Sequence, residues 1–180
     1  ALVGYFFLNR LKLGKWAYSW ILFASLSYYA WWKPENLWLI TFSILFNYSI
    51  GSRLSLTKKQ TLLKKVLFLF AILVNLSFLF YYKYIDFVIE NLNTVFGFHF
   101  SYFGKELPLG ISFFTFQQIA YLVDSFKQET REYNFTKYSL FVSFFPQLIA
   151  GPIVHHKEMM TQFEEKTNKR FSLEFFVQGV

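Results

Sequence analysis

The stretch VLFLFAILVNLSFLFYY, residues 66–82, decides the fold class of this 180-residue chain. It contains 17 residues without a formal charge, is interrupted by the polar residues Asn75 and Ser77, and ends in two tyrosines beside Lys83. A hydrocarbon core of about 30 Å is crossed by a helix of about 17 to 25 predominantly apolar residues. Tyrosines and a lysine at the end of such a run are typical of the membrane interface. The stretch therefore predicts a membrane-spanning helix.

Further apolar runs of similar length flank this stretch, at residues 16–32, 37–51, 107–123 and 138–154. Pro34 and the neighbouring tryptophans predict a tight interfacial turn between the first two runs, which would form a transmembrane hairpin. Residues 86–105 are more polar and predict a short helix followed by an extramembrane loop. Residues 1–8 and 171–180 are expected to belong to further helices. The sequence thus predicts an all-α, polytopic transmembrane fold with about five to six membrane segments.

The composition supports a membrane protein over a soluble one. The chain is 54% hydrophobic, 24% aromatic and 16% charged, whereas an ordinary soluble domain is about 25% charged. A soluble all-helical domain of this length lacks the interior volume to bury five apolar runs on all their faces. Because the chain has no cysteine, a disulfide-rich module and a cysteine-ligated metal site are also excluded.

The positive charge is concentrated near the N-terminus. Residues 1–65 contain nine basic residues and one acidic residue, and the remainder contains nine basic and ten acidic residues, so the net charge of +7 is the sum of +8 and −1. Short basic clusters between apolar runs indicate membrane topology and not nucleic-acid binding. Residues 53–65, with five basic and no acidic residues, are predicted to be cytoplasmic, as are residues 10–15. The turn at 31–38 and residues 83–105 are then predicted to lie outside.

Polar residues inside the run at 107–123 are candidate functional positions, because polar groups at membrane depth are costly unless they are paired. Ser112, Thr115 and Gln118 have the spacing of one helical face, with Gln117 beside it. Gly110 allows the close approach of a neighbouring helix. The polar face could form a hydrogen-bonding wall of an internal cavity, or it could serve only to pack helices together.

The run at 138–154 is expected to be broken. Pro146 and Pro152 cannot both lie in an uninterrupted helix, and Gly151 lies beside the second proline. Irregular backbone at membrane depth is tolerated where it is buried in protein or lines a cavity. Gln147, Gly151 and Pro152 are therefore further candidates for the lining of a passage. The alternative is a helix that ends at the interface near Ala150, followed by a surface turn.

The histidines do not form a recognisable catalytic or metal-binding constellation. His155 and His156 are adjacent, so on a helix their side chains point about 100° apart, and His99 is isolated between glycines. The sequence contains no HExxH, GxSxG, phosphate-binding or dinucleotide-binding motif. We therefore predict no metal site and no complete catalytic site within these 180 residues.

Four segments of the sequence form long motifs. The most specific are LPLGISFFTFQQIAYLVDSFKQE (107–129) and FFPQLIAGPIVHHKEMMTQF (144–163). The other two are SYYAWWKPENLWLITFSILFNYSIG (27–51) and FLFYYKYIDF (78–87). Together these segments resemble the N-terminal portion of the bacterial membrane-bound O-acyltransferase family, in the branch of the alginate and peptidoglycan O-acetyltransferases. On this resemblance, residues 1–180 form the N-terminal part of a single integral-membrane acyltransferase domain.

The resemblance implies a multi-pass enzyme of the bacterial inner membrane. Such an enzyme transfers an acyl group, usually acetyl, from a cytoplasmic thioester donor such as acetyl-CoA toward a hydroxyl of an extracytoplasmic polysaccharide. A periplasmic acetyltransferase partner often completes the transfer, and no bound cofactor is implied. A transporter or channel subunit with a polar site at the bilayer midplane is the alternative.

The resemblance also places the catalytic residue of the family outside this sequence. The family's catalytic histidine lies on a later helix and is expected beyond Val180. His155 and His156 therefore do not inherit its role. On this expectation residues 1–180 contain no catalytic residue, and the fragment alone is expected to be inactive.

Overall fold

The computed structural model describes residues 1–129, 134–150 and 156–165, together with residues 169 and 177. Throughout these residues the regular secondary structure is helical, which confirms the all-α prediction. The helices are α1 (Leu2–Arg10), α2 (Gly14–Trp32), the 3₁₀ helix η1 (Pro34–Asn36), α3 (Leu37–Leu56), α4 (Leu62–Lys83), α5 (Ile85–Phe96), α6 (Ile111–Lys127), α7 (Phe135–Ser143), α8 (Phe145–Ala150) and α9 (His156–Glu164).

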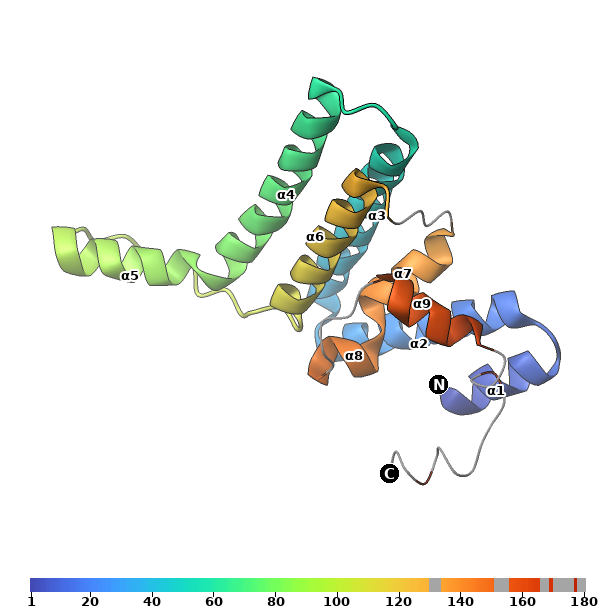
Figure 1. Ribbon diagram of the computed structural model, residues 1–180. Helices are drawn as coiled ribbons and strands as arrows, with labels where there is room; N and C mark the ends of the chain where they lie inside the picture. The colour runs from blue at the N-terminus through green and yellow to red at the C-terminus, as the bar shows by residue number, and fades with distance from the viewer. Residues whose placement is uncertain (130–133, 151–155, 166–168, 170–176, 178–180) are drawn as a thin grey trace.

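Helices α3, α4 and α6 lie side by side, and each contacts the other two (Figure 1). A glycine permits the closest approach between α3 and α6. A Cβ atom at Gly51 would lie 2.2 Å from Cε1 of the Tyr121 ring, and that ring is itself buried, with 1% of its surface exposed. Because a buried ring cannot move aside easily, position 51 has no room for a side chain.

The sequence predicts that the runs containing α2 and α3 form a transmembrane hairpin, and the structure differs from this prediction in how α2 packs. The tight turn is present, with Pro34 in the first turn of η1, as the fixed φ of proline favours. Beyond the turn, α2 packs mainly against α1 and α7 and contacts α3 much less (Figure 1). The two apolar runs therefore do not form a closely packed antiparallel pair. Helix α9 covers α7, and the ion pair between Lys137 and Glu164 joins the two.

Helix α4 has the composition predicted for a membrane span. Among the described helices it is the one that is long and apolar enough to cross a membrane, and only 22% of its most apolar 18-residue window is buried. Large apolar side chains recur along its exposed face at helical spacing: Val66, Leu69, Phe70, Leu73, Leu76 and Phe80. The predicted five to six spans are thus not confirmed by length and hydropathy.

The run at 138–154 is broken, as predicted, but the first break precedes the prolines. Helix α7 ends at Ser143, and Phe144 (φ −58°, ψ 103°) leaves the helical conformation before α8 begins. This break places Pro146 in the first turn of α8, where its missing N–H removes no helical hydrogen bond. The predicted break near Gly151 and Pro152 lies outside the described residues.

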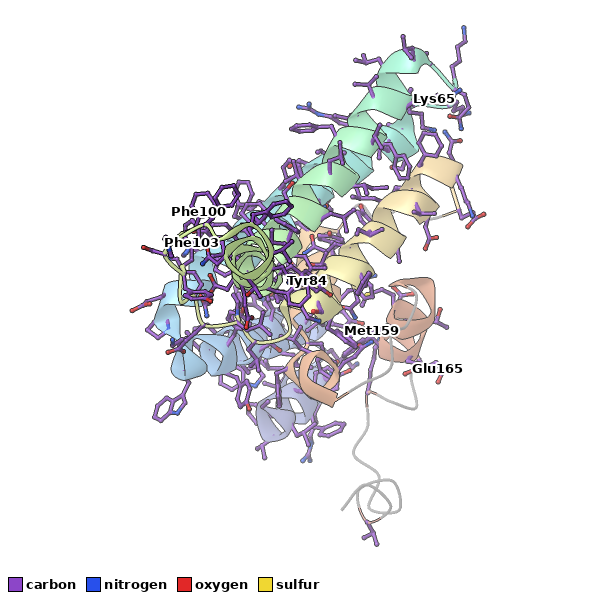
Figure 2. All side chains as sticks on the ribbon, turned by 90° about the vertical axis from the view of Figure 1, so that its left-hand side faces the viewer. Lys65, Tyr84, Phe100, Phe103, Met159 and Glu165 are labelled. Carbon is purple, nitrogen blue, oxygen red and sulfur yellow. The ribbon has the colours of Figure 1, made fainter. Side chains whose placement is uncertain are left out.

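Helix α5 and the loop after it project from the bundle (Figure 1). The loop folds back along α5: the Asp86 carboxylate accepts hydrogen bonds from the backbone N–H groups of Phe103 (2.7 Å) and Gly104 (3.0 Å). The Asn93 side chain forms two more hydrogen bonds with the backbone of Phe100, each 2.9 Å. The short helix and loop predicted for residues 86–105 are therefore confirmed, and Figure 2 shows Phe100 and Phe103 on this projection.

Two long-range contacts define the ends of the bundle. Lys33, at the start of η1, forms an ion pair with Glu106, which precedes α6. At the opposite end, Nε2 of Gln128 donates a 2.7 Å hydrogen bond to the carbonyl oxygen of Thr57. The turn at 31–38, which is predicted to lie outside, thus contacts the residue that follows the predicted outside segment 83–105 at one end of the bundle. The basic segment 53–65 lies at the other end.

Candidate functional site

A chain of polar side chains crosses the helical bundle. The Tyr138 hydroxyl on α7 donates to Oε1 of Gln118 on α6 (3.2 Å), and Nε2 of Gln118 donates to Oγ of Ser43 on α3 (2.8 Å). Nδ2 of Asn47 lies 3.4 Å from the same Ser43 oxygen. Asn47 and Asn75 then exchange two hydrogen bonds, of 3.0 and 2.6 Å, between α3 and α4. This chain of hydrogen-bonded polar side chains joins four helices.

All five residues of this polar chain are buried, each with 7% or less of its surface exposed. An amide or hydroxyl that loses its partner in such surroundings costs about 1 to 3 kcal/mol. Of these five residues, Gln118 is a candidate from the sequence, and Asn75 was noted only as a polar interruption of an apolar run. Ser43, Asn47 and Tyr138 were missed. Ser43 and Asn47 are four residues apart and share one helical face, so this spacing was an available signal.

The polar residues predicted on α6 separate into two groups. Thr115, Gln117 and Gln118 are almost completely buried, with 2% or less of each exposed. Ser112 lies near the start of α6 and is partly exposed, and its Oγ lies 3.4 Å from Nζ of Lys83. Gln117 differs from Gln118 because its buried Oε1 has no hydrogen-bond partner in the described part of the chain.

A second glycine, Gly110, allows α8, which belongs to the broken run 138–154, to lie next to α6. Gly110 caps the start of α6 with φ +67°, and a Cβ atom there would lie 2.9 Å from Cγ of Leu148 on α8. The predicted close approach at Gly110 is thus confirmed. Gln147, beside Leu148, is 9% exposed. The structure therefore brings α8 to the beginning of α6, whereas Gly151 and Pro152 lie outside the described residues.

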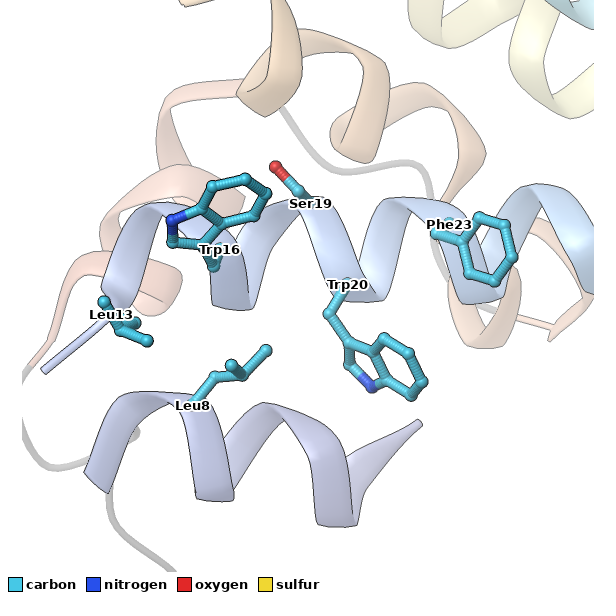
Figure 3. A pocket seen from close by; sticks show the side chains of 6 residues that line it. All are labelled: Leu8, Leu13, Trp16, Ser19, Trp20 and Phe23. Atoms are coloured by element: carbon cyan, nitrogen blue, oxygen red, sulfur yellow. The ribbon is translucent and has the colours of Figure 1, made fainter. Parts of the chain in front are cut away.

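Two hollows lie away from these polar residues. One, of about 440 Å³, lies between α1 and α2 and is lined by Leu8, Leu13, Trp16, Ser19, Trp20 and Phe23 (Figure 3). This lining has no titratable group, so it offers no proton donor or acceptor for catalysis. The other, of about 420 Å³, lies where α3 ends and α4 begins. None of the predicted passage residues lines either hollow.

Within the described residues, no group of three or more histidine, cysteine or acidic side chains is placed to hold a metal ion. His99 is exposed in the loop after α5. His156 begins α9, and His155 is outside the described residues. The described geometry therefore contains polar helix contacts but no assembled set of catalytic groups.

The catalytic histidine expected from the family resemblance has no position in this sequence to compare. It was expected beyond Val180, the last residue of the 180, and Val180 itself lies outside the described residues. The expectation that the histidine follows Val180 therefore stays a prediction.

Curated proteins similar to this chain share one chemistry. A peptidoglycan O-acetyltransferase of Helicobacter pylori is 40% identical over 193 residues, which cover 93% of this chain and 36% of that protein. A probable alginate O-acetylase AlgI of Pseudomonas aeruginosa is 35% identical over 168 residues, which cover 88% of this chain and 31% of that protein. The AlgI of Azotobacter vinelandii is 33% identical over the same share of this chain. No family model and no solved structure matches the sequence.

These similarities confirm the resemblance in the sequence. Over about nine-tenths of its length the chain is similar to proteins of the membrane-bound O-acyltransferase family. Within that family its relatives are the peptidoglycan and alginate O-acetyltransferases. The chain spans about a third of the length of these curated relatives.

Proposed function

We propose that the protein containing this chain is an O-acetyltransferase that passes an acetyl group across the bacterial inner membrane to an extracytoplasmic polysaccharide. The observation that carries this proposal is the similarity over 93% and 88% of the chain to a peptidoglycan O-acetyltransferase and an alginate O-acetylase. Acetyl-CoA is the proposed donor, and a periplasmic acetyltransferase is the proposed partner that completes the transfer. The acceptor is a hydroxyl of a polymer such as peptidoglycan or alginate.

The proposed protein crosses the membrane several times. Helices α3, α4 and α6 have 20, 22 and 17 residues, so at 1.5 Å per residue they are about 26 to 33 Å long. This matches a hydrocarbon core of about 30 Å. Helix α2 and the broken segment of α7 and α8 are the other proposed membrane segments, which gives five. The basic segment 53–65 is proposed to face the cytoplasm.

We place the route of the acetyl group beside α6 and α8. Ser112, Thr115, Gln117, Gln118, Gln147, Gly151 and Pro152 are proposed to line or shape it without taking part in the chemistry. The unpartnered Oε1 of Gln117 supports this role, because a buried amide oxygen with no partner can accept a hydrogen bond from an N–H or O–H group of the molecule that carries the acetyl group. Gln118 has both ends of its amide engaged by Ser43 and Tyr138, so it is proposed to hold the wall in shape.

Substitution at these positions tests the proposal in cells. A strain that lacks the gene is complemented with the full-length wild-type protein, with Gln117→Leu, or with the matched control Gln60→Leu, which changes an exposed glutamine. O-acetyl groups are then released from the isolated polysaccharide and quantified. We expect the wild type and Gln60→Leu to restore acetylation. Gln117→Leu should lower it about tenfold at equal expression, because the amide oxygen that would accept a hydrogen bond from the acetyl carrier is lost. Unchanged acetylation with Gln117→Leu would remove that residue from the route, and failure of the wild type would reject the function.

A further inference from the structure

The ammonium group of Lys64 is buried, and it forms no ion pair within the described part of the chain. Lys64 lies in the first turn of α4, and only 3% of its surface is exposed. Its Nζ has no hydrogen-bond partner in the described part of the chain. Its closest recorded interaction is a cation–π contact, with Nζ 5.0 Å from the centre of the Phe126 ring on α6. A cation–π contact leaves the three N–H donors of the ammonium unsatisfied.

The surroundings of Lys64 contain further positive charge. Residues 53–65 include Arg53, Lys58, Lys59, Lys64 and Lys65 and no acidic residue. Arg53 lies in the last turn of α3 and is exposed, and it forms no ion pair with any described acidic side chain. A buried cation in a basic region is costly unless an anion accompanies it. The neighbouring end of α6 and the residues after it add Asp124, Lys127 and Glu129. With these three counted, the region still has a net positive charge, which favours an anionic ligand.

The hollow beside Lys64 suits a ligand with a charged end and an apolar end. Its volume is about 420 Å³, and its lining combines Arg53, Thr57, Thr61 and Lys64 with the leucines Leu54, Leu56, Leu63 and Leu67. It lies at the end of α4 that Lys65 marks in Figure 2. Leu63 is 77% exposed, and it begins the apolar surface that continues along α4. A largely apolar pocket that contains two basic side chains and opens onto an exposed apolar helix face has the two parts of a lipid site.

We propose that this pocket binds the phosphate of an anionic phospholipid. Arg53 and Lys64 both line the pocket, and their charged groups contact the phosphate oxygens. The acyl chains lie along the exposed face of α4. Basic pockets between helices at the cytoplasmic membrane surface bind such headgroups. The inference rests on the proposed function only because that proposal places residues 53–65 at the membrane surface.

Lipid retention measured by native mass spectrometry tests the site in the full-length protein. The protein is reconstituted with equal amounts of phosphatidylglycerol and phosphatidylcholine, extracted in a neutral detergent, and the copies of each lipid that remain bound are counted. The variants are Arg53→Gln and Lys64→Met. Lys65→Gln is the matched control, since it removes the same charge from the adjacent, exposed position. Because Arg53 is exposed, its variant keeps the test valid if Lys64→Met does not fold.

We expect the wild type to retain phosphatidylglycerol in preference to phosphatidylcholine. Arg53→Gln and Lys64→Met should each lower that preference about fivefold, and Lys65→Gln should lower it less than about twofold. Equal losses in Arg53→Gln and Lys65→Gln would show diffuse surface attraction and overturn the site. Displacement of the lipid by millimolar inorganic phosphate would also overturn it, in favour of a soluble phosphate ligand. Retention does not require acetyl transfer, so a failure here is distinguishable from failure of the proposed function.

Discussion

Gln118 on α6 donates a 2.8 Å hydrogen bond to Ser43 on α3, although 75 positions separate the two residues in the chain. Both residues lie in segments that carry the resemblance to the O-acetyltransferases. The contact therefore joins two separate pieces of that resemblance inside the bundle. Tyr138 and the pair of Asn47 and Asn75 extend the same connection to α7 and α4. Polar pairing of this kind fixes which faces of the apolar helices meet.

Removing the centre of this polar chain should destabilise the protein. Gln118→Leu leaves Ser43 and Tyr138 each without one hydrogen bond in buried surroundings, so we expect a loss of about 1 to 2 kcal/mol in the free energy of unfolding. Thermal unfolding of the full-length protein in detergent measures this loss. Gln60→Leu, a change of an exposed glutamine, should have no measurable effect. Equal stability of Gln118→Leu and wild type would show that the hydrogen-bonded chain does not contribute to folding.

A side chain at Gly51 should push α3 and α6 apart. In Gly51→Ala the new Cβ would lie 2.2 Å from the buried Tyr121 ring, and overpacking of this type costs about 1 to 3 kcal/mol. The expected result is a lower unfolding temperature of the full-length protein. Gly14→Ala is the control, because the nearest atom to a Cβ there is 3.9 Å away. An unfolding temperature for Gly51→Ala as high as that of Gly14→Ala would contradict the close approach of the two helices.

The sequence was sufficient for the elements but not for their packing. The apolar run at 66–82 and the proline at position 34 act locally, and the structure contains the corresponding helix α4 and the turn η1. The packing of α2 on α7 depends on contacts between side chains more than 100 residues apart in the sequence. The spacing of apolar residues within one helix cannot predict such contacts. The break at Phe144 was not predicted, because the proline pattern does not show that Pro146 lies in the first turn of a new helix.

For the candidate site, the sequence likewise predicted the polar residues of one helix but not their partners on other helices. Helical spacing identified the polar face of α6, and Thr115 and Gln118 are buried there. The spacing of a single helix cannot say which neighbour supplies the partners, so Ser43 and Tyr138 were not found. Nor could it distinguish Gln117, with its unpartnered carbonyl oxygen, from the fully engaged Gln118. That distinction requires the positions of α3 and α7.

The contact between α7 and α9 should depend on pH. A hydrogen bond from Lys137 and its positive charge lower the pKa of Glu164 below the ordinary value of 4.5. A carboxylate with a lowered pKa stabilises the folded state above its unfolded pKa, and this contribution is lost as the pH falls through the folded pKa. The unfolding temperature of the full-length protein should therefore exceed that of Glu164→Gln at about pH 7 and match it at about pH 3. The difference at neutral pH is small, because the Glu164 side chain is 56% exposed.

If the unfolding temperatures of the wild type and Glu164→Gln differ by the same amount at acidic and at neutral pH, Glu164 does not act through its charge. The comparison with Glu165→Gln controls for a general effect of acidic charge in the same segment. Glu165 lies just after the end of α9 and is exposed.

The orientation of the bundle can be mapped with single cysteines, because this chain has none of its own. In a full-length background without other cysteines, Lys59→Cys and Tyr102→Cys place thiols at opposite ends of the bundle. A membrane-impermeant maleimide applied to intact cells, with the outer membrane permeabilised, should label Tyr102→Cys and should label Lys59→Cys only after the inner membrane is opened. Leu73→Cys, on the exposed apolar face of α4, should resist labelling in both conditions. Labelling of both loop cysteines from one side would contradict the proposed topology.

Transfer of labelled acetyl groups across a membrane tests the central claim most directly. Inverted inner-membrane vesicles that contain the full-length protein, its periplasmic partner and the acceptor polysaccharide in the lumen are supplied externally with acetyl-CoA that carries a radioactive acetyl group. After washing, the label in the polysaccharide is counted. We predict that the label accumulates on the polysaccharide in an alkali-labile ester and that vesicles without the protein accumulate none. Equal labelling in the two kinds of vesicle would contradict the account.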